Sequence, residues 1–235
     1  MTHMHIPDGV LPVWLWALGF LLMALFMGLS LYRLKGADRK KQIPLLGALS
    51  AAMLVAMSLE IVPLAYHINL TVVAGILLGP ALGFIAAFIV NFMLALIGHG
   101  GITVIGLNTL MLGAEAVLGH TFFSFLGRRL PIFWRAALAT VLTLFITTGL
   151  LVGIVAVSNM NPAVFTEGHG HEEGGHEGPI SVERFAAMAL GLGALGWIIE
   201  AAITGAVVRF MAQVKPELLR HVLHADRAKK GRETS

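Results

Sequence analysis

The chain has 235 residues, of which 57% are hydrophobic and only 12% are charged, and its mean hydropathy is +0.83. A soluble surface needs about twice that share of charged residues, and a chain this apolar does not remain disordered. The composition therefore indicates an integral membrane protein. The chain has no cysteine, which excludes a disulfide framework and a thiolate metal site.

The apolar runs predict an all-α integral membrane protein with seven transmembrane helices, since a helix needs about 20 apolar residues to cross a bilayer. In chain order the predicted spans are 11–32, 43–62, 68–79, 81–98, 102–127, 132–158 and 184–211. The third run is too short to cross comfortably. Joining it to the fourth across Gly79 and Pro80 would give an alternative with six spans.

The basic residues favour seven spans and predict the orientation. With an external N-terminus, the clusters at 33–41, 128–135 and 209–232 all fall on the inner side, and only Arg184 falls outside. Six spans would move Arg128 and Arg129 to the outer face. We therefore predict an external N-terminus and an internal C-terminus. The first span lacks a basic n-region, so it is not read as a cleaved signal peptide.

We predict a single polytopic membrane domain over residues 1–235. Its parts outside the spans are an external N-terminal metal-binding segment at 1–11, an external His- and Glu-rich loop at 159–183, and a basic cytoplasmic tail at 212–235. Small residues recur every four positions at Gly75, Gly79 and Gly83, and again from Ala48 to Ala56. This spacing predicts close helix packing, within the bundle or against a partner helix.

Several function classes are excluded. The chain has no G-x-x-x-x-G-K-[ST] loop and so cannot hydrolyse ATP itself. His171 and His176 are five residues apart in a glycine-rich stretch, which is not the spacing of a zinc-protease helix. We therefore predict no catalytic residue, no resident cofactor and no nucleic-acid partner.

The His- and Glu-rich loop is either a solvated polar loop or a loose scavenging site for divalent metals. Its imidazoles are His169, His171 and His176, and its carboxylates are Glu167, Glu172, Glu173 and Glu177.

The N-terminal residues carry a more specific signal. If translation starts at Met4, its free amine, the His5 amide nitrogen and the His5 imidazole can hold three corners of a square plane, a geometry that selects Ni²⁺, Cu²⁺ or Co²⁺. If Met1 is retained, the Met1 amine, the Thr2 and His3 amides and the His3 imidazole instead supply four nitrogens, which fill the plane without His67. Removal of Met1 would recreate the three-nitrogen pattern on Thr2 and His3.

A fourth ligand could come from His67, which lies at the outer end of a predicted span. Glu60 and Asn108 lie in the outer parts of their spans, where they could orient a ligand imidazole or the N-terminal segment. Glu115, His120 and Glu200 also fall within spans, where polar groups face the bundle interior and take a structural role or a part in transport.

These motifs resemble the substrate-binding membrane subunits of cobalt and nickel energy-coupling-factor (ECF) transporters, the CbiM/NikM family. The similar stretches are Met4-His5-Ile6-Pro7-Asp8-Gly9, Pro63-Leu64 leading to His67, Leu78-Gly79-Pro80, and Gly100-Gly101-Ile102-Thr103 through Asn108. The resemblance implies a seven-helix bundle whose metal ligands are Met4, His5 and His67.

The resemblance also implies a function. The chain would be the substrate-specific component of an ABC-type ECF importer for Ni²⁺ or Co²⁺, ions that supply cobalamin synthesis or nickel enzymes. Its partners would be a membrane scaffold component, two ATPase subunits and a small accessory membrane subunit, in the cytoplasmic membrane of a prokaryote. The alternatives are a passive divalent-metal channel, a metal sensor, or an intramembrane enzyme that uses Glu115, His120 and Glu200.

Overall fold

The computed structural model describes Gly9 and residues 11–35, 42–58, 67–127, 130–158 and 181–219. Within these ranges the chain forms seven α-helices, one short 3-10 helix and no strand. The helices are α1 (Val13–Leu34), α2 (Gln42–Ser58), α3 (Thr71–Leu78), α4 (Pro80–Leu96), α5 (Ile105–Phe125), α6 (Ile132–Ser158) and α7 (Val182–Val214), followed by the 3-10 helix Pro216–Leu219. The prediction of an all-α protein is confirmed for the described residues.

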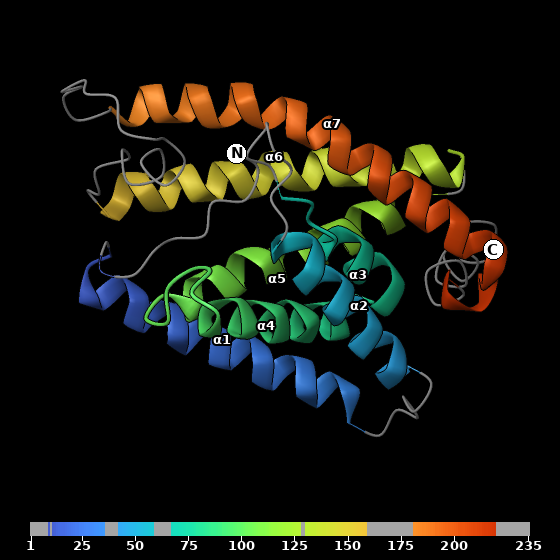
Figure 1. The fold of residues 1–235 in the computed structure, drawn as a ribbon, viewed down its shortest axis with the longest axis horizontal. Helices are drawn as coiled ribbons and strands as arrows, with labels where there is room; N and C mark the ends of the chain where they lie inside the picture. The colour runs from blue at the N-terminus through green and yellow to red at the C-terminus, as the bar shows by residue number, and fades with distance from the viewer. Residues whose placement is uncertain are drawn as a thin grey trace, which may run out of the picture.

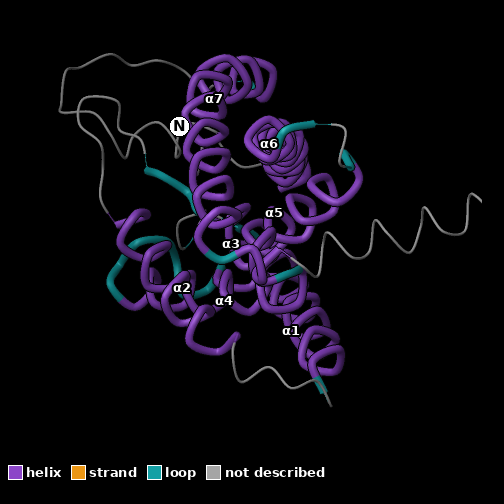
Figure 2. Tube along the Cα trace, turned by 90° about the vertical axis from the view of Figure 1, so that its right-hand side faces the viewer, coloured by secondary structure: helices purple, strands orange, loops and turns teal. Residues whose placement is uncertain are grey.

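The helices pack as an elongated bundle around α3, α4 and α5 (Figure 1). The two longest helices, α6 and α7, lie side by side and share the most extensive interface. On the opposite flank α1 packs against α4 and α5, whereas α2 packs against α3 and α4 (Figure 2). Short α3 is thus enclosed by longer helices.

The bundle has two ends that differ in their side chains. At one end Leu11, Val104, Val155 and Phe185 form one buried apolar cluster, which joins the start of α1 and α5 to the end of α6 and the start of α7. We call this the histidine end, because His99 follows α4 there. The other end, where α1, α5 and α7 finish, is called the arginine end.

Three helices of the described chain are long and apolar enough to cross a membrane: α1, α6 and residues 183–214 of α7. Helices α2 and α4 are apolar but shorter. Apolar side chains of α1 are exposed along its length, and its only buried residues are Leu15, Gly19 and Ser30. A helix that is apolar all round and mostly exposed suits a lipid environment.

Each of the seven predicted spans contains one α-helix, although several ends differ. The last helix runs from 182 to 214 rather than from 184 to 211. The fifth begins at Ile105 rather than at 102, since the chain before it still turns after Gly98 and Gly100, which both have positive φ. The described part of α2 ends at Ser58.

The third predicted span is indeed too short to cross. Helix α3 has eight residues, about 12 Å of helix against some 30 Å of hydrocarbon, and all eight are buried. Gly79 ends it with φ 83° and ψ 171°, a conformation that L side chains rarely adopt, and Pro80 then starts α4. A single continuous helix across Gly79, on which the six-span alternative depended, is therefore not formed.

Close packing at the glycine-spaced positions is confirmed. A Cβ on Gly75 would lie 2.0 Å from the carbonyl oxygen of Ala116, so the backbones of α3 and α5 touch. A Cβ on Gly83 of α4 would lie 3.0 Å from the Cα of Gly75, a less severe but still close approach. The small-residue face of α2 behaves differently, because Ala48 and Ala52 are exposed.

Candidate metal centre

His67 lies in the non-helical segment 67–70 that leads into α3. Its side chain is half-buried, and its Nδ1 atom is removed from solvent. Its last residue, Leu70, is the N-cap of α3 and makes no side-chain hydrogen bond to the start of that helix. Irregular backbone at this depth of a membrane protein is tolerated where it is packed in protein or lines a cavity.

A second imidazole lies beside His67. The ring centroids of His67 and His99 are 6.0 Å apart, and the two rings are nearly perpendicular, at 89°. His99 is exposed in the turn after α4, where its backbone N–H donates to the carbonyl of Leu94 at 2.8 Å. The structure therefore brings together two histidines that are 32 residues apart in the sequence.

The sequence analysis missed His99. The available signal was its position in Gly98-His99-Gly100-Gly101, a turn predicted to lie on the same side as His67. A histidine in a glycine-rich turn has no periodic pattern that marks it as a ligand.

Two residues beyond His67, Asn69 is held by side chains from distant helices. Its Nδ2 donates to Oε2 of Glu115 on α5 at 2.5 Å, and its Oδ1 accepts the backbone N–H of Thr71 at 2.8 Å and the Thr71 hydroxyl. The other carboxylate oxygen of Glu115 accepts from Oγ1 of Thr147 on α6 at 3.3 Å. All four side chains are at most 3% exposed. Glu115 is one of the three intramembrane groups predicted to face the interior. It forms part of this hydrogen-bond network.

Asn108 is 3% exposed in the first turn of α5, and its backbone N–H donates to the carbonyl of Val104 at 3.0 Å. Since Val104 and Leu11 belong to the same buried cluster, Asn108 lies at the end of the bundle where the chain enters α1. This places Asn108 at the histidine end, which agrees with its predicted position.

The remaining predicted site residues lie outside the described part of the chain. They are His3, Met4, His5, Glu60, His169, His171 and His176. Among the residues that are described, no group of three or more His, Asp or Glu side chains could hold a metal ion.

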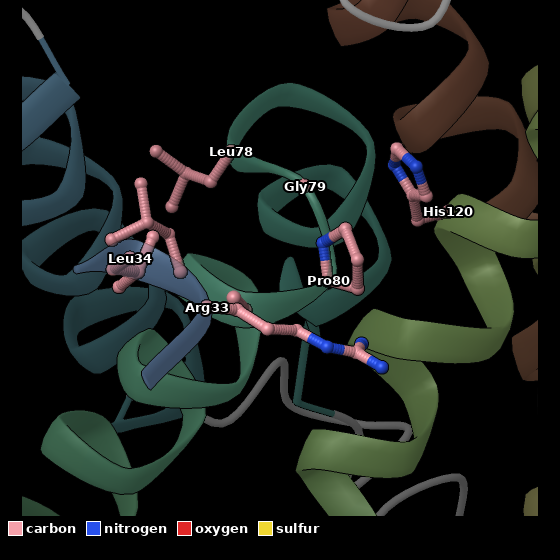
Figure 3. A pocket seen from close by; sticks show the side chains of 8 residues that line it. Arg33, Leu34, Leu78, Gly79, Pro80 and His120 are labelled. Carbon is pink, nitrogen blue, oxygen red and sulfur yellow. The ribbon is translucent and has the colours of Figure 1, made fainter. Parts of the chain in front are cut away.

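A cavity of about 220 Å³ lies at the arginine end and not beside His67. Arg33 of α1, the Gly79–Pro80 turn and His120 of α5 line it (Figure 3). The side chain of Arg33 extends past Pro80 toward α5 in this view. His67, the predicted metal ligand that the structure describes, is not among the residues that line this cavity. The third intramembrane group, Glu200 of α7, is 1% exposed and is not among the cavity's lining residues either.

Comparison with known proteins identifies the family. The family model described as "Cobalt uptake substrate-specific transmembrane region" matches residues 5–218. The chain belongs to the CbiM family. That family consists of membrane proteins for cobalt and nickel transport, which are metal transporter components and not enzymes.

Several relatives support this membership. The cobalt transport protein CbiM of Clostridium tetani is 31% identical over 155 residues, 62% of this chain and 64% of that protein. A fused nickel transport protein NikMN of Archaeoglobus fulgidus is 37% identical over 109 residues, 45% of this chain and 36% of that one. The match thus covers under two thirds of either relative. A metal transport protein of Haloquadratum walsbyi is 28% identical over 227 residues, 92% of this chain and 93% of the relative.

Two solved structures share the fold. A crystal structure of a transition metal transporter has a TM-score of 0.73 at 21% identity, covering 94% of this chain and 99% of that one. A truncated transition metal transporter has a TM-score of 0.69 at 22% identity, with 89% and 99% covered. Because the sequence identity is this low, the likeness to these two structures shows the fold alone.

Proposed function

We propose that this CbiM family member is the substrate-specific component of an energy-coupling-factor importer that captures Ni²⁺ or Co²⁺ at the outer face of a prokaryotic cytoplasmic membrane. The observation that carries the proposal is the position of His67, on irregular chain at the same end of the bundle as Leu11, where the N-terminal segment joins α1. The names of the relatives, which are cobalt and nickel transport proteins, support the substrate class.

The length of the N-terminal segment supports this arrangement. Seven residue steps separate Met4 from Leu11, which allows an extended reach of at most about 25 Å. Packed helices are some 8–10 Å apart, so this reach spans more than two helices. The Met4 amine, the His5 amide and the His5 imidazole would supply three nitrogens, and His67 the fourth.

The chemistry of this donor set suits the proposed ions. Four nitrogens in a plane favour Ni²⁺ and Cu²⁺ over ions that prefer oxygen ligands, such as Mg²⁺ and Ca²⁺. Because Nδ1 of His67 is buried, we assign Nε2 as its binding atom. Asn108 would orient the inserted N-terminal segment, and Glu60 would orient a ligand imidazole, as predicted from the sequence.

Energy for uptake would come from the partners, because the chain has no nucleotide-binding loop. We propose a membrane scaffold component, two ATPase subunits and a small accessory membrane subunit. The ion would be released on the inner side when the ATPase complex reorients this component.

A nickel titration tests the site. Purified protein that starts at Met4 is expected to bind one Ni²⁺ with the visible d–d spectrum of a square-planar complex. His5→Ala, His67→Ala and acetylation of the amine should each abolish that spectrum, since each removes one nitrogen. His120→Ala is the matched control, because His120 lines the cavity at the arginine end.

Two results would contradict the proposal. If nickel affinity survives both His67→Ala and acetylation, the site is misplaced, and loss of binding in His99→Ala alone would assign the imidazole to His99. Metal flux through vesicles that contain this chain without ATPase subunits would indicate a passive channel.

A further inference from the structure

We infer that Glu115 is a positioning residue for the metal centre: through its hydrogen bond to Asn69 it fixes the segment that carries His67. The inference rests on the proposed function, because it concerns the same imidazole. It adds a buried side chain of α5 that does not touch the ion.

The first step in the argument is the place of Asn69 in the chain. Asn69 follows His67 by two residues and precedes α3 by two, so it lies in the middle of the irregular segment 67–70. Its Oδ1 accepts the backbone N–H of Thr71, the first residue of α3, at 2.8 Å, in an Asx-turn that satisfies an N–H with no partner inside the helix. The Asn69 side chain therefore determines how the chain enters α3.

The second step is the anchor for Asn69 itself. Its Nδ2 donates to Oε2 of Glu115, which is 46 residues away on α5, and Oε1 of Glu115 accepts from Thr147 on α6. The carboxylate thus joins the irregular segment to two long helices at once. A buried hydrogen bond to a carboxylate is stronger than one between neutral groups, and a partner left unpaired is costly.

The third step is that α3 does not need this network to stay in place. All eight of its residues are buried, and Gly75 touches the backbone of Ala116. The network lies instead at the N-terminal end of α3, before the first helical hydrogen bond, which runs from the Ala74 N–H to the Leu70 carbonyl at 2.9 Å. Its specific effect is therefore on segment 67–70, which presents His67 beside His99.

An exchange of side chains gives the sharpest test. In Asn69→Asp a second carboxylate would face Glu115, whereas Asn69→Asp combined with Glu115→Gln restores an amide–carboxylate pair in the opposite direction. In that double variant the aspartate still accepts the Thr71 N–H, and the glutamine oxygen still accepts from Thr147. Glu115→Gln alone keeps an acceptor for Asn69, whereas Glu115→Leu keeps none.

Three quantities are measured on the protein that starts at Met4 and runs to the C-terminus. They are the nickel dissociation constant, the d–d spectrum of the nickel complex and the melting temperature without metal. Glu115→Leu and Asn69→Asp should weaken nickel binding by about 10- to 100-fold and change the spectrum. Glu115→Gln and the double variant should bind nickel with the wild-type affinity and spectrum. A change of spectrum reports the ligand geometry, which a loss of stability alone does not alter.

Two matched controls separate positioning from the general loss of buried polar groups. Glu200→Leu removes a carboxylate that is equally buried, on α7. Thr143→Val is the control for Thr147→Val. It removes a hydroxyl on α6 that donates to the carbonyl of Ala139 in its own helix. Neither control should change the nickel spectrum.

The outcomes distinguish this inference from the proposed function. If His67→Ala abolishes nickel binding while Glu115→Leu and Asn69→Asp bind as the wild type does, the inference is overturned and the proposed function stands. A double variant that fails to restore binding, whether through lost folding or lost affinity, also overturns the inference. If the wild type binds neither nickel nor cobalt, both proposals fail.

Discussion

At the scale of single residues, Arg135 shows how a charge is accommodated inside this bundle. It is 1% exposed on α6 and donates through Nε to the carbonyl of Phe123 and through Nη2 to that of Ser124, at 3.5 Å. Its guanidinium carbon also lies 4.2 Å from the centre of the Phe123 ring. The last carbonyls of a helix have no partners within that helix and carry partial negative charge. Arg135 therefore caps α5 from a neighbouring helix.

Replacing this arginine should destabilise the protein. Arg135→Leu leaves buried carbonyls at the end of α5 without their donor, at a cost of about 1–3 kcal/mol. The measurement is thermal unfolding of the detergent-solubilised protein, followed by the fluorescence of its four tryptophans. Arg209→Leu, at an exposed position of α7, is the control and should stay within about 0.5 kcal/mol of the wild type. Equal melting temperatures for the two variants would contradict the capping role.

Single residues were only partly predictable. His67 could be proposed as a ligand because it stands at the end of an apolar run and within a motif that resembles a known family. Asn69 and Glu115 could not be paired, since they are 46 residues apart and no local period links them. Arg135 was counted as an inner-side charge, but a charge count does not show that its guanidinium is buried against α5.

At the scale of elements, the sequence predicted the seven helices well because the length of an apolar run is a direct physical signal. The shortness of α3 was visible in the same way, and Gly79 followed by Pro80 marked its end. The exact ends were less accurate, since the turn before α5 and the long ends of α7 depend on packing against neighbouring elements. Which helices touch could not be derived from composition at all.

The contact between α3 and α5 gives a test at this scale. Gly75→Ala places a methyl group against backbone atoms of Ala116, which cannot rotate away as a side chain could, so α3 must move. Overpacking of this kind costs about 1–3 kcal/mol, and the melting temperature should fall accordingly. Gly28→Ala on α1 is the control, because nothing lies within 4 Å of its added methyl group. A Gly75→Ala protein as stable as the control would show that α3 can shift freely.

At the scale of the whole molecule, most of the basic residues in the described ranges lie at one end of the bundle. Of the six lysines and arginines in the described ranges, Arg184 alone lies at the histidine end, at the start of α7. The other five lie at the arginine end, where α1 and α7 finish and α6 begins: Arg33, Lys35, Arg135, Arg209 and Lys215. A positive inner face would place the arginine end in the cytoplasm and the histidine end outside.

Cysteine labelling can test this orientation cleanly, because the chain has no cysteine of its own. Ile102→Cys is exposed at the histidine end and should react with a membrane-impermeant maleimide on intact cells. Glu217→Cys, exposed beyond α7, should react only after the membrane is permeabilised. The reverse pattern would invert the orientation and place His67 on the cytoplasmic side.

The glycine contact between α3 and α5 also bears on how such a molecule can work. The backbones of α3 and α5 meet with no side chain between them, and Gly83 brings α4 against Gly75 as well. The centre of the bundle therefore has no loosely packed interface along which two groups of helices could separate. We therefore expect α3, α4 and α5 to keep their packing when an ion held by His67 is released. The ion would leave either when the N-terminal segment that we propose to bind it withdraws, or when the protein tilts as one rigid body.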